Sequence, residues 1–389
     1  MPESLKVLIF IKGLDLGGYS GGADLFGANL ACQLDKHGIE VTLCVCYKFN
    51  TKAENEILSS LLTSGITPNF LLEWSGHPGV RGYIDALRKL NYYLEEHPIN
   101  IIHSHFHTGT LLSVLLKQFG KVRWVVRTAH VDQEWTRGWR GLIRQSIIRI
   151  LIFVIFPLFV DLEAGVSSNS VEILNQRFIA KVFNKYAMVI HNAIPIPDGF
   201  DLSVRQKDYT GWQGNHPIVG SIGRLEEQKG YEYLLAAIPE VLLQYPSLET
   251  WLIGDGQLNN KLKEQSEMFG IRDHVVFWGK QNKIPVLLSK MDLFVSSSLY
   301  EGLPTVVLEA MMYGIPCVVT DIPGTRDITQ EKNVVVIPAG DSKALAGAIC
   351  HVLGTPSLRQ TLVENAVQTV KRFCIENISL EYLDAYRKL

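Results

Sequence analysis

The chain has 389 residues, of which 47% are hydrophobic and 20% are charged, as in ordinary packed globular proteins. This length exceeds that of one typical domain, so we expect two domains of up to about 200 residues each. The formal net charge of −2 argues against a general electrostatic grip on nucleic acid, and we expect no nucleic-acid partner.

The N-terminal residues 1–13 are too short and too lightly charged for a signal peptide, and they predict a first strand instead. The six cysteines form no C-x-x-C pair, and several lie in apolar stretches. This is typical of buried free thiols in a reducing compartment. Together these features predict a cytoplasmic protein.

The first half of the chain alternates strand-like and helical segments. In chain order we predict a strand at 5–11, a helix at 23–36, a strand at 40–46, a helix at 57–63, a strand at 69–72, a helix at 82–95, and strands at 99–103 and 124–128. Each strand is apolar at nearly every position, as expected when helices cover both faces of a sheet. The alternation predicts an α/β domain with a parallel, doubly wound sheet.

The longest apolar run, residues 147–160, is interrupted by Arg149 and contains Pro157. It is shorter than the roughly 20 residues that span a bilayer, so we expect a buried helix. Tryptophans and arginines precede it from residue 135 onward. This composition has two interpretations, a surface at 135–160 that touches a membrane or a helix that covers a sheet.

Residues 193–215 break the alternation with two prolines and three glycines, which predicts an interdomain linker. The alternation then restarts. We predict strands at 218–222, 249–253, 275–278, 293–296 and 316–320, and helices at 231–244, 258–269, 284–290, 304–312, 343–353, 357–373 and 378–389. The repeated architecture predicts two Rossmann-like domains.

Residues 221–230, with the sequence SIGRLEEQKG, lie between a predicted strand and a predicted helix. Gly223 allows a tight turn, and Arg224 and Lys229 then lie near the carboxyl edge of the sheet, where ligands bind in open α/β sheets. Two cations at a helix entrance suit a diphosphate. The alternative is a plain connection whose charges are solvated.

A second motif, EGLPTVVLE, runs from Glu301 to Glu309. Pro304 suits the first turn of a helix, whose amino end exposes the amides around Thr305 and Val306 as an anion site. Glu309, about one turn deeper, can accept two hydrogen bonds from a ribose diol, and Glu301 can reach a sugar hydroxyl. The alternative is that both carboxylates only favour a helix amino end, but the apolar run around Glu309 weakens it.

The first half carries weaker signals. The glycine loop at residues 17–24 lets the backbone approach a phosphate or sugar, but it lacks the G-x-G-x-x-G spacing of a dinucleotide site. His103, His105 and His107 follow a strand and suit zinc if they converge, although no cysteine or carboxylate close in sequence completes the set. We favour a histidine at the strand end that faces the interdomain cleft, with His130 facing the same cleft.

These motifs, in this order, resemble the large retaining family 4 of glycosyltransferases, and the resemblance covers nearly the whole chain. Its specific parts are the paired glutamates of EGLPTVVLE and the loop at 223–230. Further matching segments are Gly21–Asp24, Ile102–His105, Val189–Ile194, Ile253–Gly256, Val276–Gly279 and Gly314–Asp321.

The resemblance implies the GT-B fold, in which two Rossmann-like α/β domains with doubly wound parallel sheets face a cleft and a C-terminal helix crosses back. It implies an N-terminal acceptor-binding domain at 1–195, with 375–389 packed on it, and a nucleotide-sugar-binding domain at 205–374. The implied reaction is retaining transfer of a sugar from a nucleotide diphosphate sugar, without a cofactor. The family's common setting implies a lipid-linked glycan or polysaccharide acceptor, and a cytoplasmic or peripheral inner-membrane location.

Residue by residue, the resemblance assigns Arg224 and Lys229 to the diphosphate, Glu309 to the ribose, and His105 to the reacting sugar. The implied donor-binding residues are Gly22, Arg224, Lys229, Gly254, Trp278, Glu301, Gly302, Leu303, Thr305, Val306 and Glu309. The implied catalytic residues are His105, Glu301, Arg224 and Lys229. The acceptor side is assigned to Asp24 and His130.

The chain departs from the family at Asp24, where Glu is usual, and at Ala193, where Gly is common. It has no D-x-D motif. Cationic side chains and helix amides can stabilise the departing phosphate in place of a metal, so we expect metal-independent transfer. Two alternatives stay open: a sugar-nucleotide 2-epimerase of the same architecture, and a non-catalytic subunit that binds a sugar nucleotide.

Overall fold

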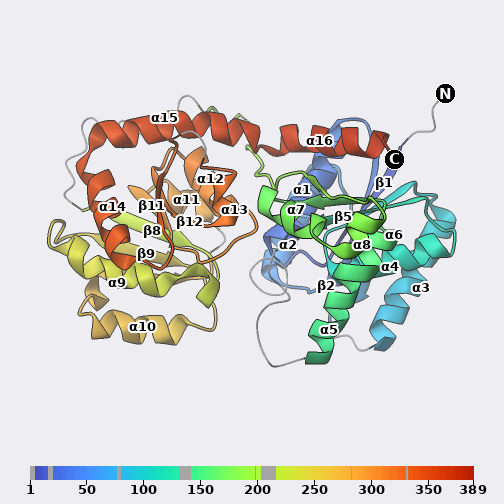
Figure 1. Cartoon of the computed structure of the whole chain (residues 1–389), viewed down its shortest axis with the longest axis horizontal. Helices are drawn as coiled ribbons and strands as arrows, with labels where there is room; N and C mark the ends of the chain where they lie inside the picture. Colours follow the sequence, from blue (N-terminus) through green and yellow to red (C-terminus); the bar gives the residue numbers. More distant parts are fainter. Residues whose placement is uncertain are drawn as a thin grey trace. The chain divides into compact units, whose positions relative to one another are not determined.

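The computed structural model describes residues 5–15, 21–76, 80–130, 142–197, 199–202, 216–281, 283–329 and 332–389. The chain divides into two compact units, which are Met1–Pro195 with Ile375–Leu389, and Ile196–Cys374. Each unit has a parallel sheet with helices on both faces, which confirms the predicted α/β class (Figure 1).

Among its described residues, the first unit has a seven-stranded parallel sheet in the order β3-β2-β1-β4-β5-β6-β7. The strands are β1 Lys6–Ile11, β2 Glu40–Lys48, β3 Asn69–Glu73, β4 Ile101–Ser104, β5 Trp124–Ala129, β6 Leu162–Gly165 and β7 Met188–Val189. The helices are α1 Gly22–Lys36, α2 Lys52–Thr63, α3 Val80–Glu96, α4 His107–Gln118, α5 Leu142–Ile150, a π-helix Leu151–Ile155, α6 Phe156–Phe159, α7 Ser168–Asn175, α8 Phe178–Val182 and α16 Ile375–Arg387. The sequence analysis did not single out α4, β6, α7 or α8.

Strand β1 lies at the centre of this sheet and is buried on both sides, because successive side chains of a strand point to opposite faces. Val7, Ile9 and Ile11 pack in one layer with α1 and α16. Leu8 and Phe10 pack in the other layer with α3 and α4. The continuous apolar run that predicted β1 follows from this two-sided burial.

The C-terminal helix α16 belongs to the first unit. The backbone amide of Ile375 donates a hydrogen bond of 2.9 Å to the carbonyl oxygen of Ile194. A second hydrogen bond, of 3.0 Å, joins the His37 ring to the hydroxyl of Ser379. The apolar face of α16, including Ile378 and Leu383, is buried with α1 in the core of this unit.

The apolar run at 147–160 differs from the single buried helix that the sequence predicts. It is divided among α5, the π-helix and α6. Ile152 and Phe156 are buried, whereas the side chains of Ile147 and Ile150 are 53% and 55% exposed. The prediction was wrong about burial because apolar composition alone does not show which side of a helix meets the sheet.

A buried ion cluster joins β5, β6 and the start of α8. The carboxylate of Glu163 pairs with the guanidinium groups of Arg127 and Arg177, and all three side chains are at most 7% exposed. Burial raises the pKa of Glu163, but the two adjacent cations outweigh this effect and hold it below its usual value. Arg177 also donates a hydrogen bond of 2.8 Å to the carbonyl oxygen of Ile152, so the cluster holds the π-helix in place.

The second unit has a six-stranded parallel sheet in the order β10-β9-β8-β11-β12-β13 among its described residues. The strands are β8 Ile218–Ile222, β9 Glu249–Ile253, β10 Val275–Gly279, β11 Leu293–Ser296, β12 Cys317–Asp321 and β13 Val335–Pro338. The helices are α9 Tyr231–Leu242, α10 Asn259–Met268, α11 Ile284–Leu288, α12 Thr305–Met312, α13 Pro323–Arg326, α14 Ser342–Gly354 and α15 Pro356–Arg372, with 3-10 turns at Glu227–Lys229 and Arg272–His274. The sequence analysis missed β13 and α13, which are short.

Both strand orders contain a switch point, where chain order reverses direction across the sheet. It lies between β1 and β4 in the first unit and between β8 and β11 in the second. The loops on either side of a switch point diverge and leave room at the carboxyl ends of the strands, where ligands of open α/β sheets bind.

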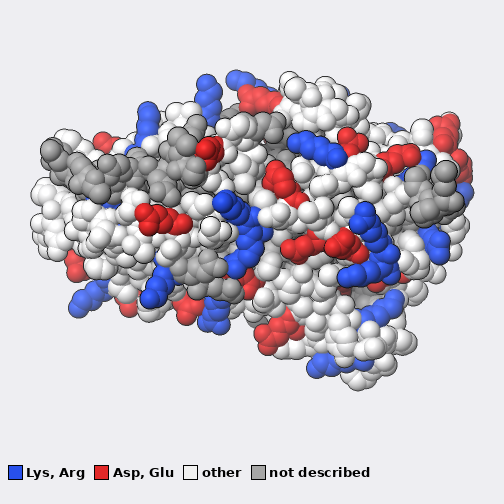
Figure 2. Space-filling view, turned by 90° about the horizontal axis from the view of Figure 1, so that it is seen from above, with Lys and Arg blue, Asp and Glu red and all other residues white. Residues whose placement is uncertain are grey.

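Across the described ranges, no helix combines the length and the apolar character that crossing a membrane requires. Acidic and basic side chains are intermixed on the face shown in Figure 2, with no broad area of one sign among the residues drawn in colour.

Candidate functional site

In the second unit, the loops after β8, β9 and β11 touch one another at the carboxyl end of the sheet. Gly230 has a φ of 58°, and a Cβ there would collide with the carbonyl oxygen of Ser297. Gly254 has a φ of 136°, and a Cβ there would collide with the carbonyl oxygen of Gly223. Only glycine combines these dihedral angles with such close approach, so the three loops form one surface.

The side chains of Lys229 and Glu301 form an ion pair across the switch point, from the loop after β8 to the loop after β11. They are 17% and 10% exposed. The hydroxyl of Ser298 donates to Glu301 Oε1 at 2.8 Å, and the amide of Gln228 donates to Oε2 at 3.3 Å. This hydrogen bonding holds a cation and a carboxylate in fixed positions at the place where a ligand is expected.

The side chain of Arg224 is more exposed than that of Lys229. It is 65% exposed, and its Nη1 donates to Glu226 at 3.0 Å on the same loop. Exposed ion pairs of this kind contribute little free energy, so an anionic ligand can take the place of Glu226 at low cost.

The helix α12 begins directly after the loop that carries Glu301, with Pro304 as its N-cap and Thr305 as its first residue. The Val307 amide donates to the carbonyl oxygen of Pro304 at 3.0 Å. The amides of Thr305 and Val306 come before the first intrahelical hydrogen bond and carry the positive end of the helix dipole. One turn further along, burial raises the pKa of Glu309 to about 7. Hydrogen bonds donated to this carboxyl group by a ligand would favour its ionised form.

The loop that contains Gly302 and Leu303 is held from a second side. A Cβ on Gly324, in α13, would collide with the carbonyl oxygen of Glu301. Gly302 and Leu303 are buried under this contact. The backbone before α12 is therefore packed against the connection that follows β12.

Trp278 lies at a β-bulge, where the pairing of β10 with β9 shifts between Phe277 and Gly279. A bulge re-aims the extra side chain. The Trp278 ring packs edge-on against Trp251 at 5.1 Å, and its Nε1 is buried without a hydrogen-bond partner in the described part of the chain. The amide of Gly254 donates to the carbonyl oxygen of Gly279 at 2.9 Å, so the bulge borders the loop after β9.

In the first unit, Asp24 bonds to the backbone just after β1 and just before α1. Its Oδ1 accepts a hydrogen bond of 2.7 Å from the Lys12 amide, and its Oδ2 accepts one of 3.1 Å from the Gly21 amide. Burial raises the pKa of Asp24. Gly22 is the first residue of α1, and apart from its own helix and chain neighbours no described atom lies within 4 Å of where a Cβ on it would lie.

Two histidines meet at the carboxyl ends of β4 and β5. His105 Nδ1 and His130 Nε2 lie 3.0 Å apart, and the two ring centroids are 5.3 Å apart. Burial, and then the neighbouring rings of His103 and His130, hold the pKa of His105 well below its usual value. His105 is therefore neutral, and its Nε2 has no hydrogen-bond partner among the described residues.

The three histidines of the HSHFH segment do not converge as a zinc site would require. His103 lies 4.3 Å from His105, ring to ring, but its nitrogens bond to hydroxyl groups. His107 stacks on Phe156 in a different layer. Within the described ranges, no three histidine, cysteine or acidic side chains are grouped so as to hold a metal ion.

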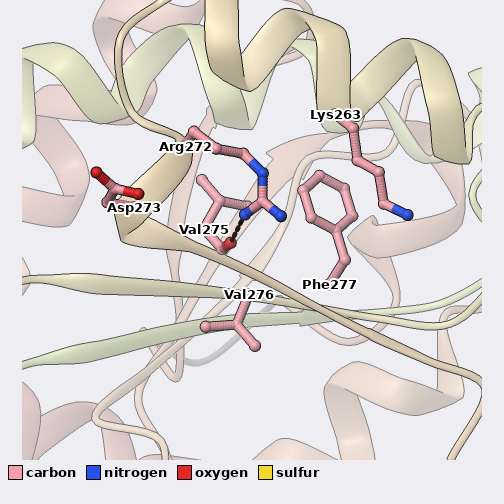
Figure 3. A pocket seen from close by; sticks show the side chains of 6 residues that line it. All are labelled: Lys263, Arg272, Asp273, Val275, Val276 and Phe277. Carbon is pink, nitrogen blue, oxygen red and sulfur yellow. Dashed lines mark hydrogen bonds between the residues drawn. The ribbon is translucent and has the colours of Figure 1, made fainter.

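A depression of about 430 Å³ lies elsewhere, at the edge strand β10. Figure 3 shows Phe277 between Lys263 and Arg272, and Arg272 donates a hydrogen bond of 3.2 Å to the carbonyl oxygen of Val275. The depression is lined by α10, the 3-10 turn before β10 and the first residues of β10. None of the candidate residues is part of that lining.

Two family models match the chain, one in each half. Residues 20–194 match the model described as Glycosyltransferase Family 4, and residues 205–369 match the model described as Glycosyl transferases group 1. The chain belongs to the family 4, group 1 glycosyltransferases. The matched residues of this glycosyltransferase lie in both units, and they include the loops described above.

Individual relatives agree with this assignment. The lipopolysaccharide core biosynthesis glycosyltransferase LpsE of Rhizobium meliloti is 33% identical over 169 residues, which are 43% of this chain and 48% of LpsE. The UDP-Gal:alpha-D-GlcNAc-diphosphoundecaprenol alpha-1,3-galactosyltransferase of Escherichia coli is 24% identical over 77% of this chain and 79% of its own length. The chain spans about half the length of LpsE and of the other curated relatives that follow it in similarity.

The fold of this glycosyltransferase is similar, over nearly its whole length, to a solved structure of Anabaena HepE in complex with UDP and glucose. The TM-score is 0.76 at 19% identity, with coverage of 99% of this chain and 100% of HepE. At this identity the likeness shows the fold, which is GT-B.

The structure brings the residues named from the sequence together within each unit. Lys229, Glu301 and Glu309 flank the switch point of the second sheet, and His105 and His130 lie side by side in the first. The sequence patterns did not point to Gln228 and Ser298, which bond to Glu301. Nor did they point to Thr128, Tyr382 and Tyr386, which form the hydrogen-bond network of His103 beside His105. For these side chains the sequence offered one signal, which is that Tyr382 and Tyr386 are four residues apart and therefore on one side of the last predicted helix. Residues 135–141 of the predicted membrane-contact stretch 135–160 lie outside the described residues.

Replacing Glu309 by Gln is expected to change how stability depends on pH. The pKa of about 7 exceeds the usual 4.5, so the neutral carboxyl stabilises the fold below pH 4.5, and this contribution is lost as the pH rises towards 7. Glu309→Gln should match the wild type near pH 4.5 and exceed its free energy of unfolding near pH 8, by up to about 3 kcal/mol. Urea unfolding at both pH values measures the effect, with exposed Glu240→Gln as the control. Parallel pH profiles for wild type and Glu309→Gln would contradict the assigned burial.

Proposed function

We propose that this glycosyltransferase moves a sugar from a nucleotide diphosphate sugar to an acceptor. The observation that carries the proposal is the Lys229–Glu301 pair, fixed at the switch point of the second sheet. The amino end of α12 and the buried carboxyl of Glu309 follow on the same loop and helix. A cation, helix amides and an acid one turn deeper match a diphosphate followed by ribose.

Lys229 and Glu301 exchange partners when the donor binds. The diphosphate takes the ammonium of Lys229, and Arg224 leaves Glu226 to join it. Glu301 is then free to accept hydrogen bonds from the hydroxyls of the transferred sugar, with the backbone of Gly302–Leu303 beside it. Because the pair is already desolvated and positioned, the exchange needs little reorganisation.

Charge development on the leaving group explains why these residues accelerate transfer. The sugar becomes oxocarbenium-like while negative charge builds on the departing diphosphate. Lys229, Arg224 and the amides of Thr305 and Val306 stabilise that charge, and donors of this type are commonly worth about 3–4 kcal/mol each. We infer metal-independent transfer for this reason.

Trp278, with its unpartnered Nε1, borders the nucleotide base together with Gly254. Gly22 offers open backbone at the start of α1. His105 is a neutral polar contact at the reacting sugar, and Asp24 shapes the acceptor side through the loop that it holds. Retention of configuration is inferred from the family, with the donor phosphate assisting deprotonation of the acceptor.

A glycan linked to a lipid is the acceptor class that we propose, because the names of the Rhizobium and Escherichia coli relatives include lipopolysaccharide core and a diphosphoundecaprenol.

The first unit has a surface suited to lipid. Phe178 and Val182 of α8 are 76% and 57% exposed, and α8 packs against the π-helix. Residues 142–160 and 177–188 contain arginine and lysine but no aspartate or glutamate. Exposed apolar side chains beside the exposed cation Lys181 favour an anionic membrane surface.

Donor binding tests the ribose assignment. Glu309→Ala removes two charge-assisted hydrogen bonds, so affinity for UDP is expected to fall about 100-fold. Isothermal titration calorimetry measures this, after circular dichroism has shown a native fold. Glu240→Ala, on the exposed face of α9, serves as the matched control and keeps wild-type affinity. Unchanged affinity in Glu309→Ala would remove the ribose assignment.

Activity is expected to survive EDTA with less than about a twofold loss, because protein groups supply the positive charge that a metal would otherwise supply. Transfer of radiolabelled sugar from the UDP-sugar that most raises the thermal midpoint is the measurement. Loss of activity that magnesium restores would reverse the proposal of metal independence. Conversion of that donor to its 2-epimer without an acceptor would support the epimerase instead.

Vesicle binding tests the lipid surface. Phe178→Ser with Val182→Ser is expected to lower co-sedimentation with phosphatidylglycerol vesicles about tenfold or more, because each buried aromatic or aliphatic side chain contributes about 1.5–3 kcal/mol. Leu243→Ser, at an exposed position in the second unit, is the control. Equal sedimentation of all three proteins, or none by the wild type, would contradict the proposal.

A further inference from the structure

Hydroxyl groups surround the buried imidazole of His103 in the first unit. The hydroxyl of Tyr386 lies 2.6 Å from His103 Nδ1, and that of Thr128 lies 2.7 Å from Nε2. The hydroxyl of Tyr382 lies 2.8 Å from that of Thr128. All four side chains are at most 2% exposed, and both tyrosines come from α16.

These contacts allow one charge state and one orientation of the His103 ring. Burial lowers the pKa of His103 to about 3, so the ring is neutral, with one nitrogen donating and the other accepting. If Nδ1 carries the proton, it donates to Tyr386 and Nε2 accepts from Thr128. If Nε2 carries it, Nε2 donates to Thr128 and Tyr386 donates to Nδ1. In either case both nitrogens are bonded, so rotation of the ring breaks two hydrogen bonds.

The oriented His103 ring supports the histidine pair of the candidate site. Its centroid lies 4.3 Å from that of His105, with 37° between the planes. The His105 ring also lies against α1, because a Cβ on Gly27 would lie only 3.1 Å from it. His105 therefore contacts both His103 and α1, and its Nδ1 contacts His130 at 3.0 Å.

We propose that Tyr382 and Tyr386 of α16 are positioning residues that fix the His105–His130 pair through His103. The inference rests on the proposed function in one respect, namely that His105 lies at the reacting sugar. A helix that only filled the core would need no buried hydroxyls here, because phenylalanine fills the same space without a polar group to satisfy. Both tyrosines direct their hydroxyls to the same His103–Thr128 pair.

Tyr386→Phe removes only the hydroxyl that meets His103 Nδ1. With the UDP-sugar donor identified by thermal shift, kcat is expected to fall about tenfold while the KM of the donor stays within about twofold, because displaced reacting groups act on the transition state more than on donor binding. Imidazole nitrogen NMR of the free protein should show a changed tautomer ratio at His105. Tyr382→Phe, one hydrogen bond further away, should give a smaller change in the same direction.

Ser379→Ala is the matched control, because it removes the hydrogen bond to His37 from the same helix without touching His103. It should leave kcat and the His105 signals unchanged. The proposal is overturned if Tyr386→Phe leaves the His105 signals as they are. It is also overturned if Tyr386→Phe and Ser379→Ala both lower kcat in proportion to their loss of thermal stability. If the wild type transfers no sugar while the His105 signals respond to Tyr386→Phe, the proposed function fails and the positioning of His105 stands.

Discussion

The parallel sheet with a switch point is the constraint on which the candidate sites depend. In each unit the chain leaves the central strands in opposite directions, so two loops part at one place on the carboxyl edge. In the second unit these loops carry Lys229 and Glu301. In the first unit the two loops carry the residues at the amino end of α1 and His105. The charged and polar side chains of the candidate sites lie at these places, where the diverging loops leave room.

Close backbone contact turns the open edge into a rigid site. Gly230 and Gly254 let neighbouring loops approach to distances that a side chain would prevent, and the Lys229–Glu301 pair spans the same gap. The electrostatic groups are thus positioned before a ligand arrives, which is the condition under which charge stabilisation is most effective. Burial of Glu309 adds a carboxyl group whose ionisation responds to what binds beside it.

Much of the fold followed from the sequence because its strands are buried on both faces and therefore read as unbroken apolar runs. The short elements β6, β13 and α13 did not, since a few residues carry too little periodicity. Lys229, Glu301 and Glu309 were found because their motifs are local in sequence. Tyr386 and Thr128 were not, because they meet His103 across 283 and 25 residues of sequence. Contacts of that kind depend on strand order and helix docking, which no local pattern shows.

The π-helix between α5 and α6 sets which way the preceding helix faces. A π turn closes i→i+5 hydrogen bonds, so it takes up one residue more than an α turn. A continuous α-helix of the same length would instead turn the preceding segment by about 100°, which is the rotation of one residue. Ile147 and Ile150, which are now exposed, would then lie on another side of the helix. The buried guanidinium of Arg177 donates to the carbonyl oxygen of Ile152 inside the π turn, so this contact helps to keep the outward direction of both isoleucines.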